Sequence, residues 1–191
     1  MNRITIEKYD PQWNISYASE KLNIENALKH EFKGIMHIGS TSIIGMDAKP
    51  IIDIAVGLNS FSELKFHESI LNNIGYCYIN GLKMDNWYLF DKISEGKEYH
   101  LHLMPANSFR LFNQVLFKIF LEENKEYATQ YVLLKKFYVE NDAQIFYSMN
   151  KEPFVSKINK LALREWLHNL ALWEKKISKV MGYYPKISDL N

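Results

Sequence analysis

Cysteine is nearly absent from this sequence, and long apolar runs are absent altogether. The single cysteine, Cys77, allows no intrachain disulfide and no cysteine-based zinc site. We therefore expect a reducing, cytoplasmic setting. No apolar run approaches the ~20 residues that a membrane-spanning helix needs, and the first residues lack the apolar core of a signal peptide. We expect no membrane association.

A charge excess of either sign is also missing. The 191 residues include 23 basic and 22 acidic side chains, which give a formal net charge of +1. Because proteins that bind duplex nucleic acid usually carry a basic excess, we expect no such partner, although a local phosphate site stays open. The 12 tyrosines and 11 phenylalanines, together with the small net charge, exclude a mainly disordered chain.

Internal repeats and low-complexity tracts are missing too, and the length fits one domain over residues 1–191. Apolar periodicity predicts strands at 3–8, 35–38, 50–56, 76–79, 87–91 and 98–104. It predicts helices at about 10–32, 60–75, 108–121, 125–140 and 153–181. A sheet part over about 1–106 and a helical part over about 107–191 indicate an α+β fold, with a small mixed sheet packed by helices.

Glycine, proline and capping residues indicate where several of these helices and strands begin or end. Asp10 and Pro11 suit a helix start, and Gly34 is the expected end of that first helix. The glycine-containing segment 93–97 is compatible with a hairpin between the last two strands. Gly182 is the expected end of the last helix.

Several candidate functional residues follow the predicted strand 35–38. They are the small residues Gly39, Ser40, Thr41 and Ser42. A glycine lets the backbone approach an anion, and exposed N–H groups and hydroxyls can hold phosphate oxygens. Asp53 is the polar residue of the buried strand that follows, where a carboxylate can hold a metal against those phosphates. Lys49 could reach a phosphate as a point charge. The alternative is a tight turn beside a buried, hydrogen-bonded aspartate.

Two histidines lie two residues apart on the predicted strand 98–104. His100 and His102 therefore share one face of the sheet, with Cα atoms ~6.6 Å apart. With Asp53 they form a candidate His₂–carboxylate site for a divalent metal such as Mg²⁺, Mn²⁺ or Zn²⁺, and imidazole favours the latter two. The alternative is that both rings line a solvated sheet face.

His37 and several lysines admit a structural and a functional interpretation. His37 lies two residues before Gly39, so it could donate to a phosphate or complete a metal shell; the alternative is a hydrogen-bonded core histidine. The pairs Lys135-Lys136 and Lys175-Lys176 are expected on solvated helix faces.

An apolar stripe runs along the predicted last helix at helical spacing: Trp166, Leu170, Trp173, Ile177 and Met181. Such a stripe belongs to the core or to a helix–helix seam. It could also serve a homodimer formed through the C-terminal helices.

The segment HIGSTSIIGMDAKPIIDIAV, residues 37–56, resembles the signature of the GrpB family, an uncharacterised family of bacterial proteins. Further motifs extend the resemblance over nearly the whole chain: YDPxW at 9–13, LNNIGYCY at 71–78, HLHL at 100–103, YxxLK at 131–135 and YxxxKxxFV at 147–155. GrpB proteins are similar to nucleotidyltransferases, which implies a nucleotidyltransferase-like fold and a nucleotide or other phosphorylated small molecule as ligand. The last motif adds Lys151 to the expected substrate-binding residues.

The sequence departs from the nucleotidyltransferase pattern at the second carboxylate of Asp-x-Asp, where it has Ala55. Ile44 stands where the family usually has a proline after the small-residue turn. The first functional hypothesis is a metal-dependent nucleotidyl- or phosphoryl-transferase with Asp53 as the catalytic carboxylate. The alternative is a catalytically degenerate nucleotide-binding or regulatory module, which Ala55 favours because a two-metal clamp then lacks a ligand. A weaker third hypothesis is a partner protein that uses its C-terminal helices.

Overall fold

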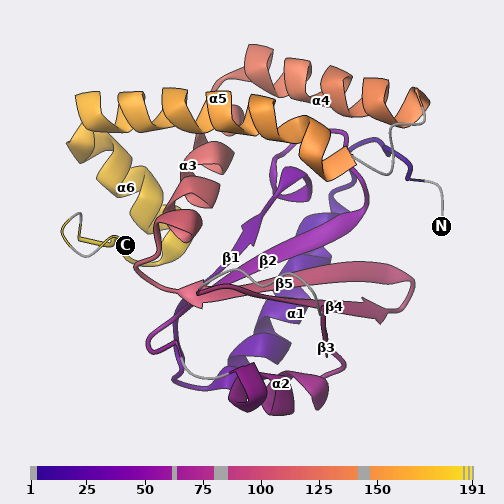
Figure 1. The fold of residues 1–191 in the computed structure, drawn as a ribbon, viewed down its shortest axis with the longest axis vertical. Helices are drawn as coiled ribbons and strands as arrows, with labels where there is room; N and C mark the ends of the chain where they lie inside the picture. Colours follow the sequence, from indigo (N-terminus) through magenta and orange to yellow (C-terminus); the bar gives the residue numbers. More distant parts are fainter. Residues whose placement is uncertain are drawn as a thin grey trace.

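A five-stranded mixed sheet organises the computed structural model of this chain (Figure 1). The structure describes residues 4–61, 64–79, 86–141, 147–186, 188 and 190. The strands are β1 (Phe32–Ile38), β2 (Ile51–Leu58), β3 (Cys77–Tyr78), β4 (Tyr88–Ser94) and β5 (Lys97–Pro105). Their spatial order is β1-β2-β5-β4-β3, so β5 lies between β2 and β4. The β2–β5 ladder is parallel, and the other three ladders are antiparallel.

Helices cover both faces of this sheet (Figure 1). One apolar core joins the sheet to α1 (Gln12–Leu28) and α2 (Leu64–Asn72). The other core joins it to the C-terminal helices, which are α3 (Phe109–Glu123), α4 (Lys125–Glu140), α5 (Tyr147–His168) and α6 (Leu170–Met181). This arrangement confirms the predicted α+β class and its helical C-terminal half.

Alternation along β2 decides which face holds the candidate site. Ile52, Ile54 and Val56 belong to the core beneath α1 and α2. Because successive side chains of a strand point to opposite faces, Asp53 and Ala55 face the C-terminal helices. Ala55 is indeed part of the core on that side.

The first helix is shorter than predicted, and a strand replaces its expected end. Pro11 is the N-cap of this helix, and Oδ1 of the preceding Asp10 accepts the backbone N–H of Gln12 at 2.9 Å, so the helix starts where predicted. The helix ends at Leu28, and the predicted extension to residue 32 is wrong. Gly34 lies inside β1 rather than at a helix end, where an added Cβ would overlap the backbone oxygen of Met181. Glycine is therefore needed at position 34 because β1 and the end of α6 approach each other closely there.

The predicted edge strand at 3–8 is reduced to a single bridge in the described residues. Glu7 pairs with Ala48 in an isolated antiparallel bridge, with N···O distances of 2.8 and 3.0 Å. Residue 3 of that prediction lies outside the described residues. The bridge joins the N-terminal segment to the loop that precedes β2.

The predicted long helix at 153–181 is two helices. α5 begins before Pro153, which lies inside it, and ends at His168. Asn169 then caps α6, because its side-chain oxygen accepts the N–H of Leu172 at 3.3 Å. Gly182 ends α6 in the left-handed conformation, as predicted.

The apolar stripe of these two helices is largely used inside the chain. Trp166, Trp173, Ile177 and Met181 are buried in the core that α3–α6 form with the sheet. Leu170, the fifth stripe residue, is 43% exposed at the start of α6. Within the residues that the structure describes, no helix has the length and apolarity needed to cross a membrane.

Candidate functional site

The carboxylate of Asp53 lies against the small-residue turn. Gly39 has φ +68°, and a Cβ at this position would overlap Asp53 Oδ2. Both the backbone conformation and this close approach require glycine, since an L side chain would be strained and would displace the carboxylate. Gly39 therefore sets the position of Asp53 relative to the turn.

The parallel β2–β5 ladder brings both predicted histidines to Asp53. His100 is in register with Asp53, and His102 is in register with Ala55. Asp53 Oδ1 lies 3.6 Å from His100 Nδ1 and 3.4 Å from His102 Nε2. Burial alone would raise the pKa of Asp53, but hydrogen bonds from the two imidazoles outweigh it and hold that pKa well below its usual range. The carboxylate is thus ionised at neutral pH.

A tryptophan decides which nitrogen of His102 carries the proton. Trp87 Nε1 donates to His102 Nδ1 at 3.3 Å, and the two rings stack with centroids 5.8 Å apart. Since an indole N–H can only donate, Nδ1 must be the unprotonated nitrogen, and Nε2–H faces Asp53. Trp87 therefore orients His102 as a hydrogen-bond donor to the carboxylate.

The predicted metal ligands are arranged as a hydrogen-bonded cluster. Among the residues described, no group of three histidine, cysteine or acidic side chains is arranged to hold a metal ion. A metal on Nε2 of His102 would require the proton to move to Nδ1, where it would meet the Trp87 N–H. Asp53, His100 and His102 do come together, but as a hydrogen-bonded cluster.

His100 lies between carboxylates. Its Nε2 is 3.1 Å from Glu98 Oε1, while Nδ1 faces Asp53. Burial opposes protonation, but the hydrogen bond and charge of Asp53 and the charge of Glu98 outweigh it and raise the pKa of His100. Its side chain is 25% exposed, so the resulting cation can be reached from solvent.

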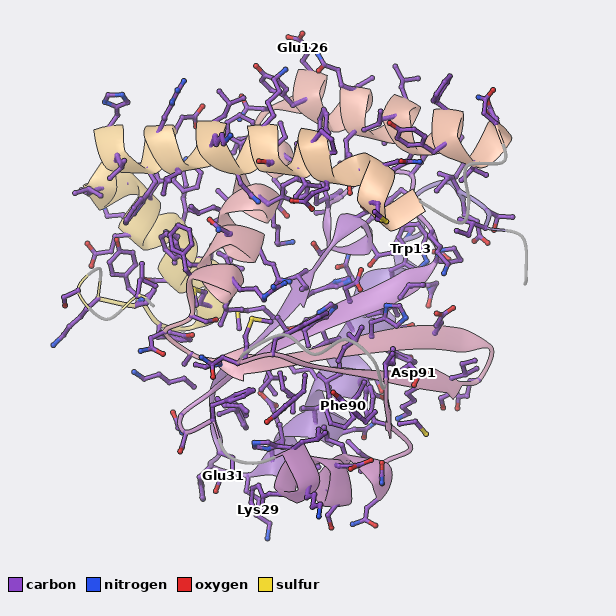
Figure 2. The ribbon with its side chains drawn as sticks, viewed as in Figure 1. Trp13, Lys29, Glu31, Phe90, Asp91 and Glu126 are labelled. Carbon is purple, nitrogen blue, oxygen red and sulfur yellow. The ribbon has the colours of Figure 1, made fainter. Side chains whose placement is uncertain are left out.

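Asp91 is a further carboxylate on this face that sequence reasoning missed. It is the residue of β4 in register with His100 and follows Phe90, which is buried in the core on the other face (Figure 2). The register comes from the tight turn at Glu95 and Gly96, both with positive φ, between the paired residues Ser94 and Lys97. The hairpin predicted at 93–97 therefore contained the signal.

Two predicted lysines approach this cluster from separate elements. Lys49 precedes β2, and Lys151 lies on α5. Burial lowers the pKa of Lys151, the negative charge of Asp53 opposes that shift, and the positive charge of Lys49 adds to it. The three side chains are therefore close enough to interact electrostatically.

A third lysine lies beside Lys151, and the prediction that it faces solvent is wrong. Lys135 of α4 is 1% exposed, and its Nζ donates to the backbone oxygen of Asp47 at 2.7 Å. Burial, followed by repulsion from Lys151, lowers the pKa of Lys135 to about 7. Its neighbour Lys136 contacts the Asp47 carboxylate at 2.7 Å and is half-buried.

Two of the three hydroxyls in the turn are engaged by the backbone. Thr41 donates to the oxygen of Ile51 at 2.9 Å, and Ser42 donates to the oxygen of Gly39 at 2.7 Å. Both side chains are buried, whereas Ser40 is half-exposed. The turn thus offers Ser40 as its accessible hydroxyl.

The structure places His37 on the opposite face of the sheet from Asp53. Its ring stacks on Tyr17 of α1 with centroids 4.7 Å apart, and its nitrogens contact Asn14 at 3.2 Å and Thr41 at 3.1 Å. Burial, with the nearby charge of Lys118, lowers the pKa of His37 to about 3. His37 is therefore a neutral, hydrogen-bonded histidine that supports the turn from below.

A family of known proteins matches most of this chain. The family described as "GrpB protein" matches residues 3–161. The chain belongs to the GrpB family. Its membership confirms the resemblance seen in the sequence motifs, whereas the link to nucleotidyltransferases stays a prediction.

Similar GrpB proteins come from several bacteria. "Glutamate-rich protein GrpB" of Alkalihalophilus pseudofirmus is 29% identical over 163 residues, which are 81% of this chain and 93% of the relative. "UPF0157 protein PA4798" of Pseudomonas aeruginosa is 29% identical over 175 residues, which are 87% of this chain and 71% of the relative. The crystal structure of GrpB from Enterococcus faecalis matches with a TM-score of 0.78 and 27% identity, over 85% of this chain and 99% of that chain. The fold is therefore shared with a solved GrpB structure.

Proposed function

We propose that this GrpB chain is a binding module for a nucleotide or another phosphorylated small molecule, held over the Asp53 face of the sheet. The observation that carries the proposal is the convergence of three lysines from separate elements: Lys151 interacts with Asp53, and Lys49 and Lys135 each lie near Lys151. A protonatable imidazole, His100, faces the same space.

Two buried lysines of this face lie near further positive charge. Burial disfavours the charged forms of Lys135 and Lys151, repulsion from Lys151 adds to this at Lys135, and repulsion from Lys49 adds to it at Lys151. A phosphate dianion beside them would oppose these effects. Asp53 does so only in part, because its Oδ1 already accepts from two histidines. A phosphate group therefore fits beside these lysines.

Binding without chemistry is favoured by the residue two positions after Asp53. Ala55 is fully buried in the position where a nucleotidyltransferase would carry its second carboxylate. Two-metal phosphoryl transfer needs ligands that hold both the attacking and the leaving oxygen. This chain lacks one such ligand on β2.

Metal-dependent nucleotidyl or phosphoryl transfer is the second candidate. It is favoured by an ionised carboxylate that remains 28% exposed and has two imidazole nitrogens within 3.6 Å. Asp53, His100 and His102 would hold the Mg²⁺, Mn²⁺ or Zn²⁺ ion, after His102 exchanged its Trp87 hydrogen bond for the opposite tautomer. The metal would supply Lewis-acid activation of a phosphoryl oxygen.

The first experiment measures the melting temperature of the full chain with ATP, GTP, CTP, UTP, ribose 5-phosphate or pyrophosphate in EDTA. A ligand at one hundred times its Kd should raise the melting temperature by roughly 5–10 °C. Lys151→Met should remove most of this rise. Lys160→Met, an exposed lysine of the same helix, should retain it. If no ligand stabilises the chain, or if both variants lose the rise equally, the binding proposal fails.

The second experiment separates binding from transfer. Each nucleoside triphosphate is incubated with the chain and Mg²⁺, Mn²⁺ or Zn²⁺, and pyrophosphate or phosphate release is measured. The binding module predicts stabilisation without release. Release that disappears in Asp53→Asn, together with metal bound in stoichiometric amount and lost in His102→Ala, would instead establish the transferase.

A further inference from the structure

A large groove opens beside β1, on the far side of the turn from the Asp53 cluster. Its volume is about 1100 Å³, slightly above the ~300–1,000 Å³ common for small-molecule sites. Residues of α1, β1, α3, α4, α6 and the loop 43–47 line it, and none of Asp53, His100, His102 or Lys151 does. The groove is therefore separate from the site proposed above.

The floor of the groove is uncharged and partly apolar. Tyr17 and the neutral His37 lie there as a stacked pair, and Ile35, Ile43 and Ile119 add apolar surface. Tyr17 donates its hydroxyl to the backbone oxygen of Ile35 at 2.9 Å. Such a floor suits the apolar body of a ligand better than a charged group.

The walls carry a surplus of positive charge. The lysines that line the groove come from four helices and are Lys21, Lys118, Lys125, Lys176 and Lys179. The lining carboxylates already have ion-pair partners: Glu122 pairs with Lys118 at 2.8 Å, and Glu123 pairs with Lys176 at 2.7 Å. Asp47 is held by Lys8 and Lys136, which lie outside the lining.

We propose that this groove is a second binding site, specific for a small organic anion with an apolar body and a carboxylate, sulfonate or phosphate group. The apolar body would cover the floor of isoleucines, and the anionic group would face Lys125 and Lys179. Charge complementarity carries the assignment, because the ion pairs of the other lining lysines leave Lys125 and Lys179 as the surplus.

The turn between the two sites belongs to both. Gly39 contacts Asp53 on one side, while the oxygen of Ser42 accepts from Lys118, a lining residue of the groove, at 2.7 Å. An anion that draws Lys118 toward itself therefore acts on the segment against which Asp53 rests. This gives the groove a physical connection to the first site without shared residues.

The test uses 8-anilinonaphthalene-1-sulfonate, an anionic probe with an apolar aromatic body, and the full-length chain. Fluorescence titration should give one site per chain. The double charge reversal Lys125→Glu/Lys179→Glu should raise the Kd by about tenfold or more. The matched double variant Lys160→Glu/Lys186→Glu, exposed and outside the groove, should change the Kd less than twofold.

A second variant tests the apolar body without changing charge. Thr129 lies exposed on the α4 wall, so Thr129→Trp should fill the groove, leave the fold intact and abolish saturable probe binding. Lys151→Met should leave probe binding unchanged, which distinguishes this site from the first. Equal weakening by the two double variants, or full binding by Thr129→Trp, would overturn the proposal.

Discussion

Gly39 is the residue at which the candidate site tolerates no added methyl group. Its φ of +68° and its contact with Asp53 Oδ2 act together. Gly39→Ala should lower the free energy of unfolding by more than about 2 kcal/mol, because backbone strain and displacement of the carboxylate add. Urea unfolding measures the change.

Gly45 provides the matched control for that substitution. It also has a positive φ, +81°, but an added Cβ would have no atom within 4 Å. Gly45→Ala should therefore cost about 1–2 kcal/mol, from backbone strain alone. Equal costs at the two positions would mean that the contact with Asp53 carries no energetic weight.

His37 makes stability depend on pH. Its pKa is about 3 in the folded chain, against ~6.5 when unfolded, because burial disfavours the imidazolium. Between these values the unfolded chain binds a proton that the folded chain does not, so the free energy of unfolding should fall as pH drops from 6.5 toward 3. Urea midpoints from pH 7 to 4 measure this slope.

The variant His37→Gln should show a flatter fall in stability over the same pH range, whatever its stability at pH 7. His168→Gln, at an exposed position, should retain the slope of the parent chain. A slope that His37→Gln leaves unchanged would assign the acid sensitivity to other groups.

Among the elements, α1 is joined to β4 by a buried ion pair. Lys92 Nζ lies 2.9 Å from Glu20 Oε1, with side-chain exposures of 12% and 5%, and Asn23 donates to the second oxygen of Glu20. Lys92→Met should cost about 3–5 kcal/mol, since it leaves a buried carboxylate unpaired. Equilibrium unfolding of the single variant and of Glu20→Met/Lys92→Met measures it, and the double variant should be the more stable.

The exposed pair Lys21–Glu25 of the same helix serves as the control for this ion pair. Its Nζ···Oε1 distance is 3.6 Å and both side chains are about one-third exposed. Lys21→Met should cost less than about 1 kcal/mol. If Lys92→Met costs no more than Lys21→Met, the buried pair does not join these elements.

For the whole molecule, the sheet half and the helical half should unfold together. The oxygen of Met181 at the end of α6 packs on Gly34 of β1, and Tyr183 donates to the oxygen of Ala106 at 2.6 Å. With 5-fluorotryptophan in the unchanged chain, the ¹⁹F signals of Trp13 and Trp173 should vanish at the same urea concentration. Separate midpoints would divide the predicted single domain into two.

Local patterns were enough to predict most of the sheet and helices. The apolar run around Asp53, the helix start at Asp10 and Pro11, the helix end at Gly182 and the turn at 93–97 each act through neighbours in sequence, and those predictions hold. The end of α1 and the break at Asn169 were missed. In the first case tertiary pairing of β1 with β2 overrides a continuous helical pattern, and in the second a single cap interrupts one.

The site could be predicted in part. Alternation along a strand is local, so the shared face of His100 and His102 followed from the sequence, whereas the β2–β5 register that brings Asp53 to them joins strands far apart in the chain. The burial of Lys135 depends on how α4 packs against α5 and on the carbonyl of Asp47, far away in the chain. The orientation of His102 likewise depends on Trp87 from another segment. The apolar periodicity of the sequence predicts neither of these two contacts.

The place of β5 in the sheet has a consequence for how the chain is synthesised. β1 with β2 forms one antiparallel unit and β3, β4 and β5 form another, and the parallel β2–β5 ladder is their sole strand-to-strand junction in the described sheet. As the nascent polypeptide leaves the ribosome, one edge of β2 must wait unpaired until β5 has emerged. Aspartate and imidazoles thus meet only when the two units dock, which makes the candidate site a late product of folding.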